Sequence, residues 1–296
     1  MTEPTADSPQ SVAELQEQLR SVGYLADRGL ATATLISLRL GRPLLLEGEV
    51  GVGKTELAKC LAQLTGRELI RLQCYEGIDT HQALYEWDYA RQMLHVRALS
   101  ERELADSTTI GGLYSEEFLL ERPLLRAVRA GGRSVLLIDE IDRADDEFEA
   151  FLLEVLSDFQ ITIPEVGTIT ADDRPIVVLT SNRTRELHDA LKRRCLYHWI
   201  GFPTASEEIA IVRVRAPGVT EALTRKVVDA VHRLRDMDLA KPPGVAETLD
   251  WVEALGAIGA DDLDGETAID TLGSVIKDRD DLEIVSSGIG RVVPDG

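Results

Sequence analysis

The segment Gly48-Glu49-Val50-Gly51-Val52-Gly53-Lys54-Thr55 decides the fold of this 296-residue chain. It satisfies the pattern G-x-x-x-x-G-K-[ST], follows an apolar run at 44–46 and precedes an amphipathic segment at 56–64. Glycines at such a turn let the backbone N–H groups point inward around phosphate groups at the start of a helix. A chance glycine-rich turn does not account for the flanking strand and helix. The pattern therefore predicts a phosphate loop.

Each residue of the loop and of the following helix start is a predicted nucleotide contact. In this motif the lysine reaches the β- and γ-phosphates and the hydroxyl coordinates Mg²⁺, which assigns these roles to Lys54 and Thr55. The predicted cofactor-binding residues are Gly48, Glu49, Val50, Gly51, Val52, Gly53, Lys54, Thr55 and Glu56.

Working outward from the loop, short apolar runs recur with helical segments between them. They lie at 44–46, 69–72, 135–138 and 176–179. Continuous apolar runs of this length are typical of parallel strands that are buried on both faces of a sheet. We therefore expect an α/β nucleotide-binding domain over residues 11–203, with a protruding hairpin at about 160–173 where two short β-type runs flank a glycine turn.

Helical periodicity replaces the apolar runs after Pro203. It occupies residues 205–214, 220–237, 245–258 and 265–277. This predicts a small all-helical lid domain over residues 204–283. At the two ends we expect a disordered leader at residues 1–10, followed by a helix with Ser11 as its N-cap, and a loose tail at residues 284–296.

Two carboxylates, Asp139 and Glu140, end the third apolar run. Open α/β sheets bind ligands at the carboxyl ends of their strands. Beside a phosphate loop, Asp139 is predicted to hold Mg²⁺ and Glu140 to orient or deprotonate the attacking water. An exposed helix-capping pair is the alternative interpretation of two such acids, and the neighbouring phosphate loop argues against it.

Two further candidates follow the fourth apolar run. Asn182 comes directly after it, where its amide could hold the attacking water, although an Asn in this position is also a common turn former. Arg193 and Arg194 lie in the basic cluster 191–194, and either is a candidate to reach a neighbouring subunit. A solvated helix C-terminus, which favours cations, is the alternative for this cluster.

Composition restricts the class of protein. With 52 acidic and 32 basic residues the net charge is −20, which argues against a broad nucleic-acid surface. The three cysteines show no C-x-x-C pair and the histidines no zinc spacing, so a disulfide framework and a zinc site are not indicated. No run of about 18 apolar residues occurs, and the leader is not a signal peptide, so we expect a cytoplasmic protein without a membrane span. The guanine-selecting N-K-x-D motif is absent, which favours ATP.

The order of these motifs, followed by a helical lid, resembles the AAA+ ATPases over residues 31–277. Shorter segments resemble the MoxR family and, within it, the CoxD-type proteins encoded with carbon monoxide dehydrogenase and similar molybdenum enzymes. They are YEWDY at 85–89, FLLERPL at 118–124, IDEIDRA at 138–144 and KPPGVAET at 241–248.

The resemblance implies a five-stranded parallel sheet and an ATPase that assembles as a hexameric ring. It further implies a chaperone that remodels or activates a client metalloenzyme together with a von Willebrand factor A domain protein. The matched positions are Lys54 and Thr55 in Walker A, Asp139 and Glu140 in Walker B, Asn182 as sensor 1, and Arg194 or Arg193 as the arginine finger. The segment at about 87–113 resembles the family's helix-2 insert, which with the hairpin at 160–173 would face the pore.

One departure from the family keeps other functions open. Where many MoxR proteins carry a lid arginine, this chain has Val245-Ala246-Glu247, and Lys241 or Arg233 is a candidate substitute. A nucleotide-gated scaffold with slow hydrolysis is therefore the alternative hypothesis. A nucleic-acid motor shares the same core motifs, but the net charge opposes it.

Overall fold

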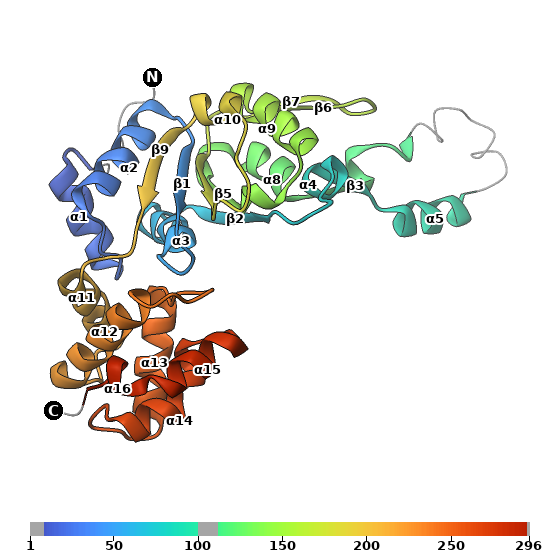
Figure 1. Cartoon of the computed structure of the whole chain (residues 1–296). Coiled ribbons are helices and arrows are strands. Elements are labelled where there is room, and N and C mark those ends of the chain that lie inside the picture. Colours follow the sequence, from blue (N-terminus) through green and yellow to red (C-terminus); the bar gives the residue numbers. More distant parts are fainter. Residues whose placement is uncertain (1–8, 100–111, 295–296) are drawn as a thin grey trace. The chain divides into compact units, whose positions relative to one another are not determined.

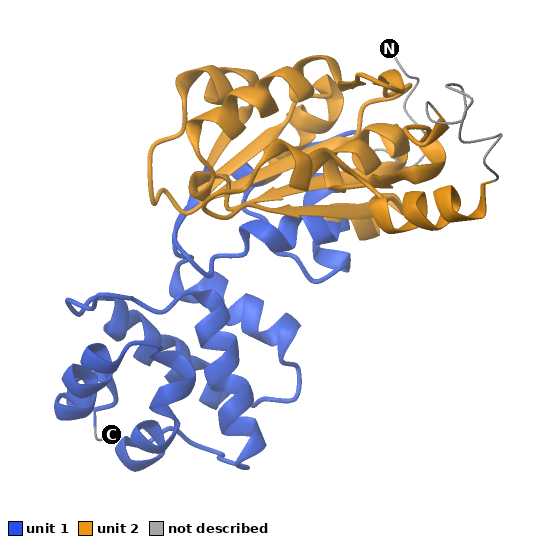
Figure 2. Ribbon diagram, turned by 90° about the vertical axis from the view of Figure 1, so that its right-hand side faces the viewer, with its two compact units in different colours: residues 1–30, 48–60, 199–296 blue, residues 31–47, 61–198 orange. Residues whose placement is uncertain are grey.

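The computed structural model describes residues 9–99 and 112–294. The chain divides into two compact units (Figure 2). The sheet unit comprises residues 31–47 and 61–198, and the helical unit comprises residues 1–30, 48–60 and 199–296. The division differs from the boundary expected at residue 203, because the phosphate loop and the first helix group with the C-terminal helices. Of the expected leader, residues 1–8 lie outside the described part of the chain.

The central sheet has five parallel strands in the order β2, β5, β8, β1, β9 (Figure 1). This confirms the predicted α/β fold. The four apolar runs form β1, β2, β5 and β8. The fifth strand, β9, is an edge strand whose residues are partly buried or exposed, so it lacks an apolar run. The bounds are β1 Leu44–Gly48, β2 Glu68–Gln73, β5 Ser134–Asp139, β8 Ile176–Ser181 and β9 Leu196–Ile200.

The central strands β5, β8 and β1 are buried on both faces, which explains their continuous apolar runs. Alternate residues such as Ile70 and Leu136 pack with helices α8 (Pro123–Ala130) and α9 (Asp146–Asp158) in one core. Residues that point to the other face, including Leu137, are also fully buried. The carboxyl ends of the neighbouring strands β5, β8 and β1 therefore meet at one edge of the sheet.

Two antiparallel ribbons extend from the sheet unit. β6 (Gln160–Ile163) pairs with β7 (Gly167–Thr170) and confirms the predicted hairpin (Figure 1). β3 (Tyr85–Trp87) pairs with β4 (Leu119–Glu121), and helix α5 (Tyr89–Ala98) follows β3. Residues 100–111 of the expected insert lie outside the described residues. The remaining helices here are α2 (Arg28–Leu40), α4 (Thr80–Leu84), α10 (Asp189–Arg194) and the 3-10 turns Glu116–Phe118, Gly131–Arg133 and Ile141–Arg143.

The helical unit confirms all four helices predicted after Pro203. Their apolar faces surround the fully buried Trp251. Helix α1 begins after Ser11, whose side chain accepts a hydrogen bond from the N–H of Glu14 as a helix N-cap. Among the described residues, no helix combines the length and apolar character needed to cross a membrane. The bounds are α1 Val12–Ser21, α3 Lys54–Thr65, α11 Ala205–Arg215, α12 Glu221–Arg235, α13 Val245–Ala257 and α14 Gly265–Val275.

The loose tail expected at residues 284–296 is wrong for its described part. Helices α15 (Arg279–Ser287) and α16 (Ile289–Val292) continue the helical unit. Val285 and Val292 are fully buried in its core, and the carbonyl of Val292 accepts a hydrogen bond of 2.8 Å from Arg233. Two glycines, Gly288 and Gly290, weaken the local helical signal, and tertiary packing overrides it.

Candidate active site

The phosphate loop directly follows β1 along the chain and belongs to the helical unit. Gly51 and Gly53 adopt φ angles of 75° and 92°, a left-handed conformation that side chains with a Cβ disfavour. Helix α3 begins at Lys54 immediately afterwards. The loop therefore ends at a helix N-terminus, where backbone N–H groups and the helix dipole favour anions.

The Lys54 side chain is buried and folds back over the loop. Its ammonium donates hydrogen bonds to the carbonyls of Gly48, at 2.9 Å, and Glu49, at 2.6 Å. Glu56, the last predicted contact, has its carboxylate 3.1 Å from Lys59 and 3.0 Å from Arg215. Partial burial raises the pKa of Glu56, but hydrogen bonds from these two cations outweigh it and lower the pKa. The Glu56 side chain thus has an ion-pairing role on the outside of α3.

The start of helix α13 lies against the phosphate loop. The N–H of Ala246 donates a hydrogen bond of 3.1 Å to the carbonyl of Gly51. The Glu247 carboxylate accepts from the N–H of Gly244 at 2.9 Å and caps the helix, and a Cβ on Gly51 would lie 2.8 Å from it. Small residues therefore allow a close backbone contact at the position where many MoxR proteins carry a lid arginine.

Both suggested substitutes for that arginine are engaged elsewhere. Lys241 pairs with Asp278 at 3.1 Å, and Arg233 bonds to the carbonyl of Val292. Tyr24 is a contact that sequence reasoning missed: its hydroxyl donates to the carbonyl of Gly53 at 3.3 Å. Burial raises the pKa of Tyr24, so it stays neutral. No local pattern in the sequence distinguishes it from an ordinary core tyrosine.

In the sheet unit, Asp139 ends β5 and is almost completely buried, with 3% of its surface exposed. Its Oδ1 accepts a hydrogen bond of 2.6 Å from the hydroxyl of Thr180 on β8. Its Oδ2 accepts from Nε and Nη2 of Arg71 on β2, at 3.0 and 2.5 Å. Side chains from the strands on either side of β5 thus compensate the buried charge.

Glu140 follows Asp139 in a left-handed conformation, with φ 55° and ψ 50°. Its N–H donates to the Thr180 hydroxyl oxygen at 2.9 Å. Its carboxylate accepts hydrogen bonds from Gln73 at 3.0 Å and from the Asn182 amide at 3.4 Å. The structure therefore brings together three residues predicted from the sequence: Asp139, Glu140 and Asn182.

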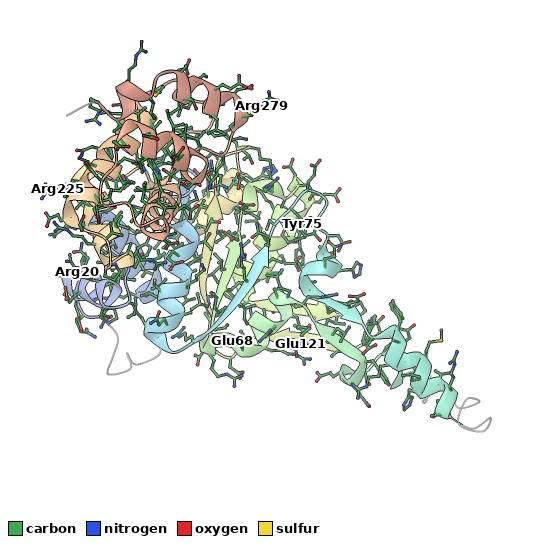
Figure 3. All side chains as sticks on the ribbon, turned by 90° about the horizontal axis from the view of Figure 1, so that it is seen from below. Arg20, Glu68, Tyr75, Glu121, Arg225 and Arg279 are labelled. Carbon is green, nitrogen blue, oxygen red and sulfur yellow. The ribbon has the colours of Figure 1, made fainter. Side chains whose placement is uncertain are left out.

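Sequence reasoning missed Arg71 and Gln73, which reach the same carboxylates from β2. Figure 3 labels Glu68 at the start of β2 and Tyr75 just beyond its end, and the two missed residues lie between them. They alternate with the buried Ile70 and Leu72. Polar residues at every second position were the available signal, since such residues share one face of a strand. The carboxylates that they contact could not be predicted from the sequence, because these contacts depend on the pairing of β2 with β5.

The carboxylates create a negative potential at this edge of the sheet. Burial, with the nearby charges of Asp139, Asp142 and Glu140, raises the pKa of the Cys74 thiol to about 12. Cys74 is therefore a protonated thiol at neutral pH and is not a candidate nucleophile. A cation bound near these carboxylates would relieve the potential.

The two finger candidates differ in their surroundings on α10. Both side chains are exposed. The Arg194 guanidinium donates to the carbonyl of Leu153 at 3.0 Å, whereas within the described residues the Arg193 side chain has no hydrogen bond or ion pair. Arg42 fastens the end of α10 by donating to the carbonyls of Arg193, Arg194 and Cys195. The Arg193 side chain is thus exposed, while hydrogen bonds from Arg42 hold the backbone at the end of α10.

Comparison with known proteins places these features in a family. Residues 43–195 match the model of the AAA domain, dynein-related subfamily. The uncharacterized protein YehL of Escherichia coli is 28% identical over 68% of this chain and 53% of its own sequence. Chaperone protein ClpB 2 of Synechocystis is 31% identical over 55% of this chain and 15% of its own. The chain thus spans about half the length, or less, of these curated relatives.

A solved structure of the RuvB Holliday junction branch migration motor of Thermotoga maritima aligns with 90% of this chain and 72% of its own, at 18% identity and a TM-score of 0.44. The family match itself covers more than half of the chain, including β1, the phosphate loop, β5 and β8. The chain belongs to the dynein-related subfamily of AAA domains.

Proposed function

We propose that the chain hydrolyses ATP with Mg²⁺ and uses the energy to remodel a partner enzyme. In this proposal Lys54 and the loop N–H groups bind the phosphates, and Glu140 and Asn182 position the attacking water. The observation that carries it is the Glu140 carboxylate, held between Gln73 and Asn182 next to the buried Asp139. Phosphoryl transfer depends chiefly on such positioning and on electrostatic stabilisation.

The residues present fit a magnesium ion. Proteins bind Mg²⁺ with one or two carboxylates, together with phosphates and waters, rather than with a complete protein cage. Asp139 supplies a nearly buried carboxylate at the end of β5. The phosphate-loop motif itself implies the Thr55 hydroxyl as a further ligand. When bound, the ion would neutralise phosphate charge.

The proposed active form is a ring in which an arginine from the neighbouring subunit completes each site. The arginine would stabilise the negative charge that develops on the transferred phosphoryl group. Arg193 is the better candidate of the two, because the guanidinium of Arg194 already bonds to the carbonyl of Leu153. Six subunits is the ring size that the MoxR resemblance implies.

The proposed client is a metalloenzyme of the molybdenum class, and the proposed partner in remodelling carries a von Willebrand factor A domain. The segments that resemble MoxR and CoxD-type proteins support this choice, including IDEIDRA at 138–144 and KPPGVAET at 241–248. The relatives named ClpB are chaperone proteins, which supports remodelling as the general activity.

The partner role predicts that ATP turnover depends on the other proteins. The chain would be purified together with a von Willebrand factor A domain protein and a molybdenum enzyme from the same organism, and steady-state ATP hydrolysis would be measured with and without each. We expect turnover to rise when both are present, and client activity to rise only with hydrolysable ATP. Unchanged turnover, together with unchanged client activity, would contradict the remodelling role.

A nucleotide-gated scaffold is the second candidate function, and the contact between Ala246 and Gly51 favours it. This backbone contact occupies the position where many MoxR proteins carry an arginine that senses the γ-phosphate. Without that arginine, nucleotide binding would order the helical unit but would be only weakly coupled to hydrolysis. The same measurement separates the two candidates. A scaffold binds its partner in the presence of ATP, and its turnover does not respond to that partner.

A further inference from the structure

Two turns at the carboxyl edge of the sheet have a strained backbone. Glu140 has a φ of 55° and Arg183, which follows Asn182, has a φ of 56°. Residues with a Cβ disfavour this left-handed region, and such residues persist only where their surroundings hold them. One turn follows β5 and the other follows β8. Contacts from neighbouring residues must therefore hold both turns in place.

Asp142 connects the two turns. It lies in the short 3-10 turn directly after Glu140, and only 2% of its surface is exposed. Its Oδ2 accepts hydrogen bonds from the N–H of Asn182 at 3.2 Å, from the N–H of Thr184 at 2.8 Å and from the hydroxyl of Thr184 at 2.7 Å. One buried carboxylate oxygen therefore holds the backbone on both sides of Arg183.

We propose that Asp142 is a positioning residue for ATP hydrolysis, because it holds Asn182 so that the amide reaches Glu140. The amide nitrogen of Asn182 lies 3.4 Å from Oε1 of Glu140. The inference rests on the proposed roles of Glu140 and Asn182. It assigns Asp142 no contact with the nucleotide.

The chemistry of the contacts explains why a residue with a side-chain acceptor occupies this position. All three groups that face Oδ2 are donors, so the residue must supply an acceptor. Within the described part of the chain, Oδ1 of Asp142 is buried and has no hydrogen-bond partner. Asparagine would keep the acceptor and remove the charge, whereas alanine would remove the acceptor of the Asn182 and Thr184 N–H groups.

The experiment compares Asp142→Ala with Asp142→Asn in the full chain. We expect Asp142→Ala to lower kcat by roughly tenfold to a hundredfold, as for a small displacement of a catalytic group. The Kd for ATP should stay within about threefold of wild type, because no ground-state contact is lost. Asp142→Asn should restore most of kcat. Asp146→Ala is the matched control, because it removes a nearby carboxylate that is exposed.

A double-mutant comparison tests whether Asp142 acts through Asn182. If it does, adding Asp142→Ala to Asn182→Ala should change kcat by no more than about twofold, because residues acting as a unit are not additive. Independent, multiplicative losses would overturn the proposal, as would an Asp142→Ala protein with the kcat of wild type. An Asp142→Asn protein that is folded but as slow as Asp142→Ala would also overturn it.

Two further controls keep the result interpretable. If circular dichroism shows that Asp142→Ala does not fold, Thr184→Val carries the same comparison with Asn182→Ala, since it removes one donor to Asp142. Glu140→Gln separates the inference from the proposed function. Loss of turnover in Glu140→Gln with full turnover in Asp142→Ala refutes the inference alone, whereas full turnover in Glu140→Gln refutes the proposed function.

Discussion

At the scale of single residues, the Asp139 carboxylate is a buried negative charge that neighbouring groups must compensate. An almost fully buried carboxylate is unfavourable unless it is paired and hydrogen-bonded. Thr180 contributes a hydrogen bond, and Arg71 contributes the positive charge. The Arg71 side chain is 53% exposed, so solvent screens part of its attraction. A bound metal ion would supply a second, stronger counter-charge for the same carboxylate.

Replacing Arg71 with methionine should therefore make the protein depend more on Mg²⁺. We expect Arg71→Met to lower the unfolding free energy by about 1–2 kcal/mol, because solvent exposure of Arg71 reduces the roughly 1.5–3 kcal/mol of a hydrogen bond to a charged group. The stabilisation by Mg²⁺ with ADP should be larger in this variant than in wild type, measured as the shift in Tm. Arg126→Met is the control, because Arg126 pairs with Glu68 on an exposed surface. Equal Tm shifts in wild type and Arg71→Met would contradict the explanation.

At the scale of elements, a buried ion pair joins three helices of the helical unit. Glu208 of α11 is fully buried and accepts two hydrogen bonds from Arg235 of α12, at 2.7 and 2.8 Å. It also accepts from Thr248 of α13 at 2.5 Å, and His232 lies 2.9 Å away. Removing one partner of such a pair leaves a buried charge or buried donors without compensation.

Glu208→Ala should consequently destabilise the helical unit by about 3–5 kcal/mol. Glu221→Ala is the matched control, because Glu221 pairs with Arg213 and Arg225 on the surface, and we expect a much smaller loss of stability from it. Urea denaturation followed by circular dichroism measures both. Similar stabilities for the two variants would show that the buried network contributes no more than a surface pair.

The elements of the fold were predictable where the signal is local. The phosphate loop, four strands and four C-terminal helices follow from motif, apolar runs and helical periodicity. Arg71 and Gln73 were not predictable as site residues, because their target depends on the pairing of β2 with β5, which is distant along the chain. Helices α15 and α16 were missed because Gly288 and Gly290 weaken the local helical signal. Packing of buried residues such as Val285 stabilises these helices nonetheless.

At the scale of the whole molecule, the proposal requires assembly. Arg42 fixes the end of α10, and Arg194 bonds to Leu153 of α9. These contacts leave Arg193 exposed on a fixed backbone, where it is available to another subunit. A site completed by a neighbour links each hydrolysis event to the interface between subunits, which a monomeric ATPase does not need.

Mixing two inactive variants tests this arrangement. We expect Arg193→Ala to assemble as wild type by native mass spectrometry but to lose most of its turnover, and Arg194→Ala to lose less. Glu140→Gln keeps its arginines but lacks the carboxylate proposed to position the attacking water. Mixed rings should regain part of the turnover, because an intact arginine then meets an intact Glu140. No recovery in rings shown to be mixed would contradict completion of the site by a neighbour.

The role of Glu140 is best tested by following ATP bound to Glu140→Gln, with wild type and the exposed control Glu147→Gln measured alongside. We expect Glu140→Gln to bind ATP with the affinity of wild type and to retain it uncleaved, with turnover lower by roughly a hundredfold or more. Glu147→Gln should hydrolyse ATP as wild type does. Turnover in Glu140→Gln equal to that of wild type would contradict the assignment of Glu140 and, with it, the proposed site.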